Sequence, residues 1–315
     1  MRYITIILVT AIPLGLGCVR NNPYDPEFRD NYQQLRHLTG VPNKRTECGF
    51  ACTDKKLYVI GGKMWGSTVT DSIDVYDLQT SEWDTILPPP MPTKRYDCKT
   101  AVVEDKIYVF GGRDAGSLIL TTVEEYDPAG NTWSVKASMP ASVIDFDIAV
   151  VDNKVYLVGG RDRAVPPTAQ SRVDLYDPAL NTWTPCAPLT TARYNLGTAV
   201  MADRIYAACG QLNGTTEYTL VEVYDPTANQ WSAGPSTNAV HTNFILTFTQ
   251  GIGVSYLHII DKNTLPDFEE LADTSSAWAE REMVEPVSIA GLSQPVNHDG
   301  NVYFTDGSNV YWFLP

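Results

Sequence analysis

Short apolar stretches alternate with polar turns along most of the chain. Residues 99–103 and 106–110 are mostly apolar runs, and residues 122–126 alternate with the period of two that is typical of a half-buried strand. Residues 127–131 (Asp-Pro-Ala-Gly-Asn) then favour a turn, and a further strand begins at residue 132. This stretch therefore predicts four antiparallel strands that form one small twisted sheet.

The same pattern occurs four times, each time with a glycine pair, a Tyr-Asp dipeptide and a tryptophan. The glycine pairs are Gly61-Gly62, Gly111-Gly112 and Gly159-Gly160, with Cys209-Gly210 as a worn fourth copy; the dipeptides begin at Tyr76, Tyr126, Tyr176 and Tyr224; the tryptophans are Trp83, Trp133, Trp183 and Trp231. Trp follows Tyr by seven residues in every copy, and successive copies are 50, 50 and 48 residues apart. One such sheet cannot bury both of its faces alone, so the period predicts units that pack face to face around an axis.

The repeated residues are interpreted as structural. Glycine permits close backbone approach and positive φ angles. Tyrosine and tryptophan supply large buried areas and carry a polar tip that a neighbouring group can satisfy. We therefore assign these positions to packing between units, not to catalysis.

The residues 107–112 (Ile-Tyr-Val-Phe-Gly-Gly), 123–128 (Val-Glu-Glu-Tyr-Asp-Pro) and 131–133 (Asn-Thr-Trp) make the chain similar to the Kelch repeat family. Members of that family are β-propellers, so the resemblance implies an all-β propeller with four antiparallel strands per blade. The clear repeats span residues 45–235, and degenerate blades occupy 236–315. In the degenerate part, Ile260-Asp261 is expected to replace Tyr-Asp and Phe268 to replace Trp, while residues 301–312 form a weak copy.

Six blades fit the length, and five are the alternative. Residues 32–42 stand where the outer strand of a preceding repeat would stand, and the chain ends like a third strand without a fourth. We therefore expect the N-terminal strand to complete the C-terminal blade, which would close the ring and remove exposed strand edges. The propeller domain is expected over residues 32–315.

Residues 1–18 resemble a targeting signal, because Arg2 precedes an apolar run that ends at Gly17-Cys18. The small residue before Cys18 resembles a bacterial lipoprotein cleavage site, with Cys18 as the lipidated residue and residues 19–31 as a tether. The resemblance implies an exported protein held by a lipid anchor at the outer membrane. An ordinary secretory signal, with a periplasmic or cell-surface product, is the alternative.

Charge and cysteine content limit the partners. The net charge of −14 disfavours nucleic-acid binding, which needs Lys and Arg to neutralise phosphates. Cys48, Cys52, Cys98, Cys186 and Cys209 remain after Cys18. Cys48 and Cys98 could form a disulfide or remain two buried free thiols, and the sequence leaves both possibilities open. No pair of cysteines has the C-x-x-C spacing of a zinc site. We expect a monomer without a metal or a cofactor.

In the Kelch family, ligands bind at the mouth of the central channel, which implies a site on the loops that enter the inner strands and follow the glycine pairs. Self-alignment places Glu47, Asp97, Asp145 and Asn195 in an acidic ring and Arg45, Arg95 and Arg193 in a neighbouring basic ring. The residues expected to bind ligand are Glu47, Tyr96, Asp97, Arg113, Asp145, Arg161, Tyr194 and Asn195. Such groups suit sugars or peptide segments. The alternative is that these charges pair between blades and only solvate a rim.

The sequence thus favours a noncatalytic recognition module at the cell envelope that binds a glycan or a protein segment. An enzyme is the alternative: Asp97 and Asp145 could serve as an acid and base, and some bacterial Kelch propellers mutarotate or epimerise sialic acid. The four histidines do not form a repeated ligand set. A structural part of an envelope complex is a third reading.

Overall fold

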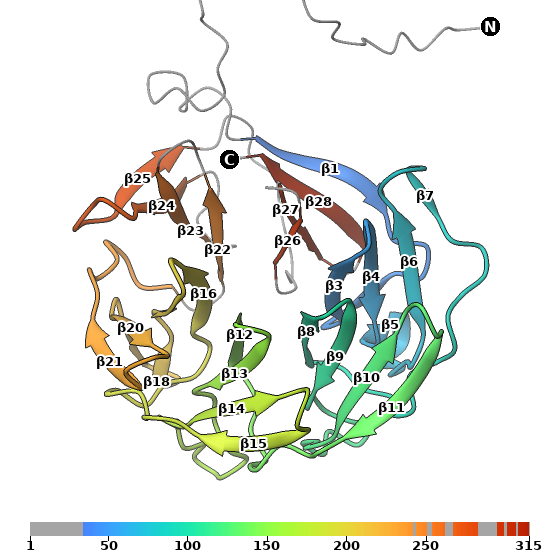
Figure 1. Cartoon of the computed structure of the whole chain (residues 1–315), viewed down its shortest axis with the longest axis horizontal. Coiled ribbons are helices and arrows are strands. Elements are labelled where there is room, and N and C mark those ends of the chain that lie inside the picture. The colour runs from blue at the N-terminus through green and yellow to red at the C-terminus, as the bar shows by residue number, and fades with distance from the viewer. Residues whose placement is uncertain are drawn as a thin grey trace, which may run out of the picture.

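Six four-stranded antiparallel sheets surround a central axis and form a disc (Figure 1). The computed structural model describes residues 34–241, 244–250, 254–261, 267–282, 295–298, 301–306 and 308–314. The expected signal, Cys18 and the tether lie outside these residues. The sheets confirm the propeller and its six blades, and the alternative of five blades is wrong.

Each blade runs outward from an inner strand beside the axis. Blade 1 contains β3 (Gly49–Thr53), β4 (Lys56–Ile60), β6 (Ile73–Asp77) and β7 (Glu82–Trp83); blade 2 contains β8 (Lys99–Val103), β9 (Lys106–Phe110), β10 (Val123–Asp127) and β11 (Thr132–Lys136); blade 3 contains β12 (Asp147–Val151), β13 (Lys154–Val158), β14 (Val173–Asp177) and β15 (Thr182–Pro185). Blade 4 contains β16 (Gly197–Met201), β17 (Arg204–Ala208), β20 (Val221–Asp225) and β21 (Gln230–Ala233); blade 5 contains β22 (Phe244–Gln250), β23 (Ser255–Asp261), β24 (Asp267–Ala272) and β25 (Ala279–Glu282). Blade 6 contains β26 (Val296–His298), β27 (Asn301–Thr305), β28 (Asn309–Leu314) and β1 (Gln34–Gly40).

Short strands and one 3₁₀ turn lie at one end of the disc. They are β2 (Arg45–Thr46), β5 (Lys63–Met64) and the 3₁₀ turn η2 (Trp65–Ser67) in blade 1, and β18 (Gln211–Asn213) with β19 (Thr216–Glu217) in blade 4. No helix in the described ranges is long and apolar enough to cross a membrane.

The N-terminal strand closes the ring as expected. β1 pairs antiparallel with β28, from Gln34 opposite Leu314 to Gly40 opposite Asn309. The last blade is therefore built from both ends of the described chain, and this removes the open edge that its three C-terminal strands would leave.

The repeated aromatic residues pack between blades, which confirms their structural role. The centroid of the Tyr176 ring lies 5.0 Å from the centroid of the Trp183 ring and 5.8 Å from that of the Phe110 ring in blade 2. The indole nitrogen of Trp183 donates to the carbonyl of Ala137, 2.9 Å away, and the Tyr176 hydroxyl donates to Asn181 at 2.8 Å. The Tyr176 ring is thus buried, the Trp183 ring is half-buried, and the polar tip of each is satisfied.

The glycine pairs are required by close contact at the ends of the second strands. Gly112 has a φ of 87°, and a Cβ at this position would lie 2.6 Å from the carbonyl oxygen of Tyr96. A side chain would therefore both strain the backbone and collide with the loop that enters β8.

The expected alignment of the fifth repeat is wrong. Ile260 and Asp261 belong to β23, the second strand, whereas the Tyr-Asp dipeptides lie on third strands. The register instead places Leu271 at the tyrosine position, 47 residues after Tyr224, and Trp278 follows it by seven residues. The Trp278 indole donates to the carbonyl of Pro235 at 2.8 Å, as the other tryptophans do to the preceding blade. The blade therefore kept its tryptophan and lost its Tyr-Asp.

The five described cysteines are free thiols. Cys48 and Cys98 are both buried, and burial raises the pKa of Cys48 to about 12 and that of Cys98 to about 11. Of the two possibilities open from the sequence, the structure shows the unbridged thiols. In the described part of the chain, no group of three or more His, Cys, Asp or Glu side chains could hold a metal ion.

Candidate functional site at the channel mouth

An arc of equivalent polar residues lies at one end of the channel. Each of the four stands two residues before the first residue of an inner strand and has a left-handed φ angle: Glu47 (54°), Asp97 (59°), Asp145 (55°) and Asn195 (53°). The amide of Asp97 donates to the carbonyl of Glu47 at 2.7 Å, and that of Asn195 donates to Asp145 at 2.9 Å. Backbone hydrogen bonds between blades thus bring the predicted residues together.

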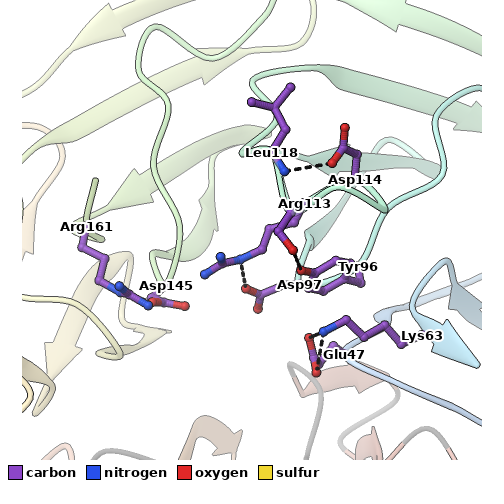
Figure 2. A network of polar contacts seen from close by, with 10 residues as sticks. Glu47, Lys63, Tyr96, Asp97, Arg113, Asp114, Leu118, Asp145 and Arg161 are labelled. Atoms are coloured by element: carbon purple, nitrogen blue, oxygen red, sulfur yellow. Dashed lines mark hydrogen bonds and ion pairs between the residues drawn. The ribbon is translucent and has the colours of Figure 1, made fainter. Parts of the chain in front are cut away.

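Each acidic residue of the arc pairs with the cation that follows its own glycine pair (Figure 2). Lys63 contacts Glu47 at 3.0 Å, Arg113 contacts Asp97 at 3.3 Å, and Arg161 contacts Asp145. The pairs form within blades and not between them, contrary to the alternative considered from the sequence. Backbone bridges such as Tyr96–Arg113 place the two loops of each pair side by side.

Blade 4 carries the uncharged version of this arrangement. Asn195 takes the place of the acid, and Gln211 takes the place of the cation, with the same two-way backbone pairing between Tyr194 and Gln211. The mouth therefore offers charged pairs on blades 1, 2 and 3 and amide groups on blade 4.

The two predicted tyrosines lie beneath the cations of the preceding blade. The Lys63 ammonium lies 3.7 Å from the centroid of the Tyr96 ring, and the Arg161 guanidinium lies 5.1 Å from that of Tyr194. Tyr96 is 6% exposed and Tyr194 is 4% exposed. These rings are therefore not open to a ligand, and they support Lys63 and Arg161 through cation–π contacts.

The expected basic ring is buried and belongs to the framework. Arg45, Arg95 and Arg193 are almost fully buried and pair with Asp74, Glu124 and Glu222 on the third strands of their own blades. Arg95 also donates to the carbonyls of Gly111 at 2.9 Å and Thr122 at 3.0 Å. We call this buried pair the clasp of a blade, because it fastens the loop that enters the inner strand to the third strand. A side chain two residues before the polar residue at the mouth is thus buried within the blade.

Blade 3 lacks the clasp cation. Val143 occupies its position, and the buried Asp174 is instead paired by Arg172 from its own strand region, with 2.9 Å between Nη2 and Oδ1. The carboxylate is kept even where the original partner is lost, because an unpaired buried charge is costly.

Electrostatics distinguish two groups at the mouth. Burial raises the pKa of Asp97, and the Asp145 carboxylate raises it further, while Arg113 opposes the rise. The side chain of Asp97 remains 36% exposed, so solvent limits this effect. Deeper in the channel, burial alone would lower the pKa of Lys99, but Asp147, 2.9 Å away, outweighs it and raises the pKa.

A feature missed in the sequence is a set of exposed apolar side chains on the loops that start at the mouth cations Lys63, Arg113 and Arg161 and at Gln211 in blade 4. Trp65 is 100% exposed, Val165 98%, Leu118 55% and Leu212 39%, and we call these four residues the hairpin tips. Hydrogen bonds inside the loops hold them: Asp114 accepts the amide of Leu118 at 2.8 Å (Figure 2), and Met64 donates to Thr68 at 2.9 Å. An apolar residue in each of the four loops was the signal available.

A cavity of about 370 Å³ lies on the axis. Each blade contributes three successive residues from its inner strand or from the residue just before it, and these form three layers of six residues. From the mouth inward, the first layer is Phe50, Thr100, Ile148, Thr198, Leu246 and Pro295. The second layer is Ala51, Ala101, Ala149, Ala199, Thr247 and Val296, and the third is Cys52, Val102, Val150, Val200, Phe248 and Asn297. Small alanines in the middle layer of four blades leave the channel open.

Comparisons with known proteins agree with this geometry. The sequence model of the KLHDC2/KLHL20/DRC7 Kelch-repeats domain matches residues 47–244, more than half of the chain. No curated protein sequence matches this chain significantly. Among solved structures, that of YjhT is similar with a TM-score of 0.68 and 12% identity, over 86% of this chain and 94% of YjhT. At this identity the likeness concerns the fold.

Proposed function

Because this chain belongs to the Kelch-repeat family of β-propellers, we propose that it is a noncatalytic recognition module that binds a protein segment at the channel mouth. The observation that carries the proposal is the exposure of the four hairpin tips around an ordered polar centre. Propeller folds host many functions, so the argument rests on these side chains and not on the fold.

The polar centre is suited to a polypeptide. Three acid–cation pairs lie in neighbouring blades; backbone pairing positions all three cations, and cation–π contacts also support Lys63 and Arg161. A ligand that meets them must present both signs of charge close together, as a protein segment does. Groups that are already ordered lose little conformational entropy on binding.

The hairpin tips favour a protein over a glycan. Sugars stack their C–H faces on exposed aromatic rings, but Tyr96 and Tyr194 are buried beneath cations. Exposed apolar side chains on ordered loops instead suit the apolar side chains of a protein partner, and tryptophan is enriched among the residues that dominate such interfaces. The net charge of −14 disfavours anionic lipid and nucleic-acid surfaces.

The test is selection of a random peptide library displayed on phage against the purified chain, with a glycan array in parallel. We expect selected peptides to lose about thirtyfold or more in affinity when Trp65 is changed to alanine, as for an interface hot spot. The matched control is Leu180→Ala, because Leu180 is also exposed but lies in the turn between β14 and β15, away from the mouth loops.

Two outcomes would overturn the proposal. One is binding on the glycan array with no peptide enriched. The other is enrichment of peptides whose affinity is unchanged by Trp65→Ala and also by Arg113→Ala with Arg161→Ala, because they would then bind elsewhere.

An enzyme acting on an acidic sugar is a second candidate, favoured by the raised pKa of Asp97 beside Asp145. NMR exchange between the anomers of sialic acid, with and without the chain, tests it. Exchange rates that do not change would remove this candidate.

We also propose that the module acts at the cell envelope, on the basis of the sequence around Cys18. Metabolic labelling with a radioactive fatty acid should mark the chain and should fail in Cys18→Ser. Export with cleavage but without label would instead support the ordinary secretory signal.

A further inference from the structure

The clasp of blade 5 differs from the others in one respect. His241 stands at the position of Arg45, Arg95 and Arg193, three residues before the residue equivalent to Cys98, and Glu269 stands at the position of Glu124. The imidazole Nε2 lies 3.0 Å from Oε1 of Glu269, and both side chains are buried. Arginine keeps its charge at every physiological pH, whereas histidine changes its charge between about pH 5 and 8.

Glu269 is held as a carboxylate. Burial alone would raise the pKa of Glu269, but hydrogen bonds from His241 and from the amides of Asn238 and Ala239, at 2.8 and 2.9 Å, outweigh it and lower the pKa. The charge that His241 faces is therefore constant over the range in which an imidazole titrates.

Among the described residues, Cys209 and Arg193 lie near His241 and do not change charge in that range. Cys209, next to Gly210, interacts with the backbone of His241, and burial raises the pKa of this thiol to about 12. Arg193, the clasp cation of blade 4, lies beyond Cys209 and stays charged. His258 is also buried in blade 5, but it contacts Thr249 at 2.6 Å and Glu270 at 3.5 Å and not Glu269.

The clasp is connected to the mouth. The amide of Gly210 donates to the carbonyl of His241 at 3.3 Å, and Gly210 directly precedes β18, which carries Gln211 and the hairpin tip Leu212. This hydrogen bond connects the backbone of His241 to the loop of blade 4 at the mouth.

We propose that protonation of His241 converts the blade 5 clasp from a hydrogen bond into an ion pair, and so makes the blade 4–blade 5 side of the mouth pH-sensitive. Burial opposes the imidazolium, but the adjacent Glu269 carboxylate, 3.0 Å away, favours it and prevails in this proposal. The added stability is present below the ordinary pKa of histidine and is lost as the pH rises through the pKa of His241 in the folded chain. The other clasps that the described residues show contain arginine and do not respond.

Hydrogen exchange followed by mass spectrometry tests the device at about pH 5 and about pH 8, with protection factors corrected for intrinsic exchange. We expect peptides from residues 234–241 and 267–282 to be about tenfold more protected at the lower pH, as for the gain of one charge-assisted hydrogen bond, while blade 2 peptides do not change. His241→Arg, which copies the neighbouring clasps, should abolish the difference and keep the high protection.

His241→Gln provides a second variant that cannot titrate, should the arginine fail to fit, and His258→Gln controls for the other buried histidine. Protection that is independent of pH in the unmodified chain would overturn the proposal. So would a pH dependence that survives in both His241 variants or that disappears in His258→Gln.

The effect on ligand affinity rests on the proposed function, but the exchange experiment does not. If the pH-dependent protection is found and no peptide binds, the device stands and the proposed function falls. If peptides bind and protection does not change with pH, the reverse holds.

Discussion

Blades 2 and 5 share one backbone plan but little of the repeat signature. Blade 2 has the glycine pair, Tyr126-Asp127 and Trp133, whereas blade 5 retains only Trp278 at its equivalent place. Their registers nevertheless agree: Ala101 faces Tyr108 in blade 2, and Thr247 faces His258 in blade 5. The difference teaches that strand pairing defines a blade more deeply than the Tyr-Asp dipeptide does.

The largest effect is expected from removal of a clasp cation. Arg95→Met would leave Glu124 buried, with only Thr93 as a hydrogen-bond partner at 2.6 Å, and should cost about 3–5 kcal/mol of the free energy of unfolding. Urea unfolding followed by tryptophan fluorescence measures this loss.

The control for this variant combines Arg95→Met with Glu124→Leu. The second change removes the unpaired buried carboxylate and should recover most of the lost unfolding free energy. A single variant as stable as the unmodified chain would show that the clasp does not hold the blade. It would also weaken the parallel drawn between blades 2 and 5.

A smaller effect is expected where blade 5 already lacks a group that other blades have. Leu271 replaces the tyrosine whose hydroxyl, in Tyr176, donates to Asn181. Tyr176→Phe should cost about 1 kcal/mol, because Asn181 still accepts the amide of Ala137 at 2.8 Å. Urea unfolding of Tyr176→Phe, of Asn181→Gly and of the variant that carries both changes isolates the hydrogen bond between the two side chains. Losses of unfolding free energy that add strictly would argue that the hydroxyl contributes nothing through Asn181.

The smallest effect is expected at the mouth. Arg161→Ala removes a partly exposed ion pair with Asp145 and the contact with Tyr194, and should cost at most about 1 kcal/mol. The same urea measurement at low and high salt checks it, with Arg161→Lys as the charge-preserving control. A loss near that of Arg95→Met would make Arg161 part of the framework and not of the site.

Much of the fold could be predicted because it depends on periodic residues. The fifty-residue spacing fixed the repeat unit, and the unpaired strands at the two ends indicated the closure between β1 and β28. Ile260-Asp261 was assigned wrongly because it resembles Tyr-Asp in its side chains. The constant spacing of seven residues between Tyr and Trp, counted back from Trp278, leads instead to Leu271.

The mouth could be located from the sequence, but the direction of its side chains could not. Arg95 and Asp97 are two residues apart, yet one is buried against Glu124 and the other lies at the mouth with Arg113. Self-alignment identifies equivalent positions, but it does not say which partner each side chain reaches. The hairpin tips were missed for a related reason: Trp65 and Leu118 stand at unequal distances from their glycine pairs.

The pairing of β1 with β28 also determines when a newly made chain can be completed. β1 leaves the ribosome before any other described strand, and its partner leaves after all the others. Throughout synthesis, β1 and the open flank of blade 1 remain available to other chains. The time needed to translate the chain from β1 to β28 therefore sets how long the nascent protein is exposed to aggregation.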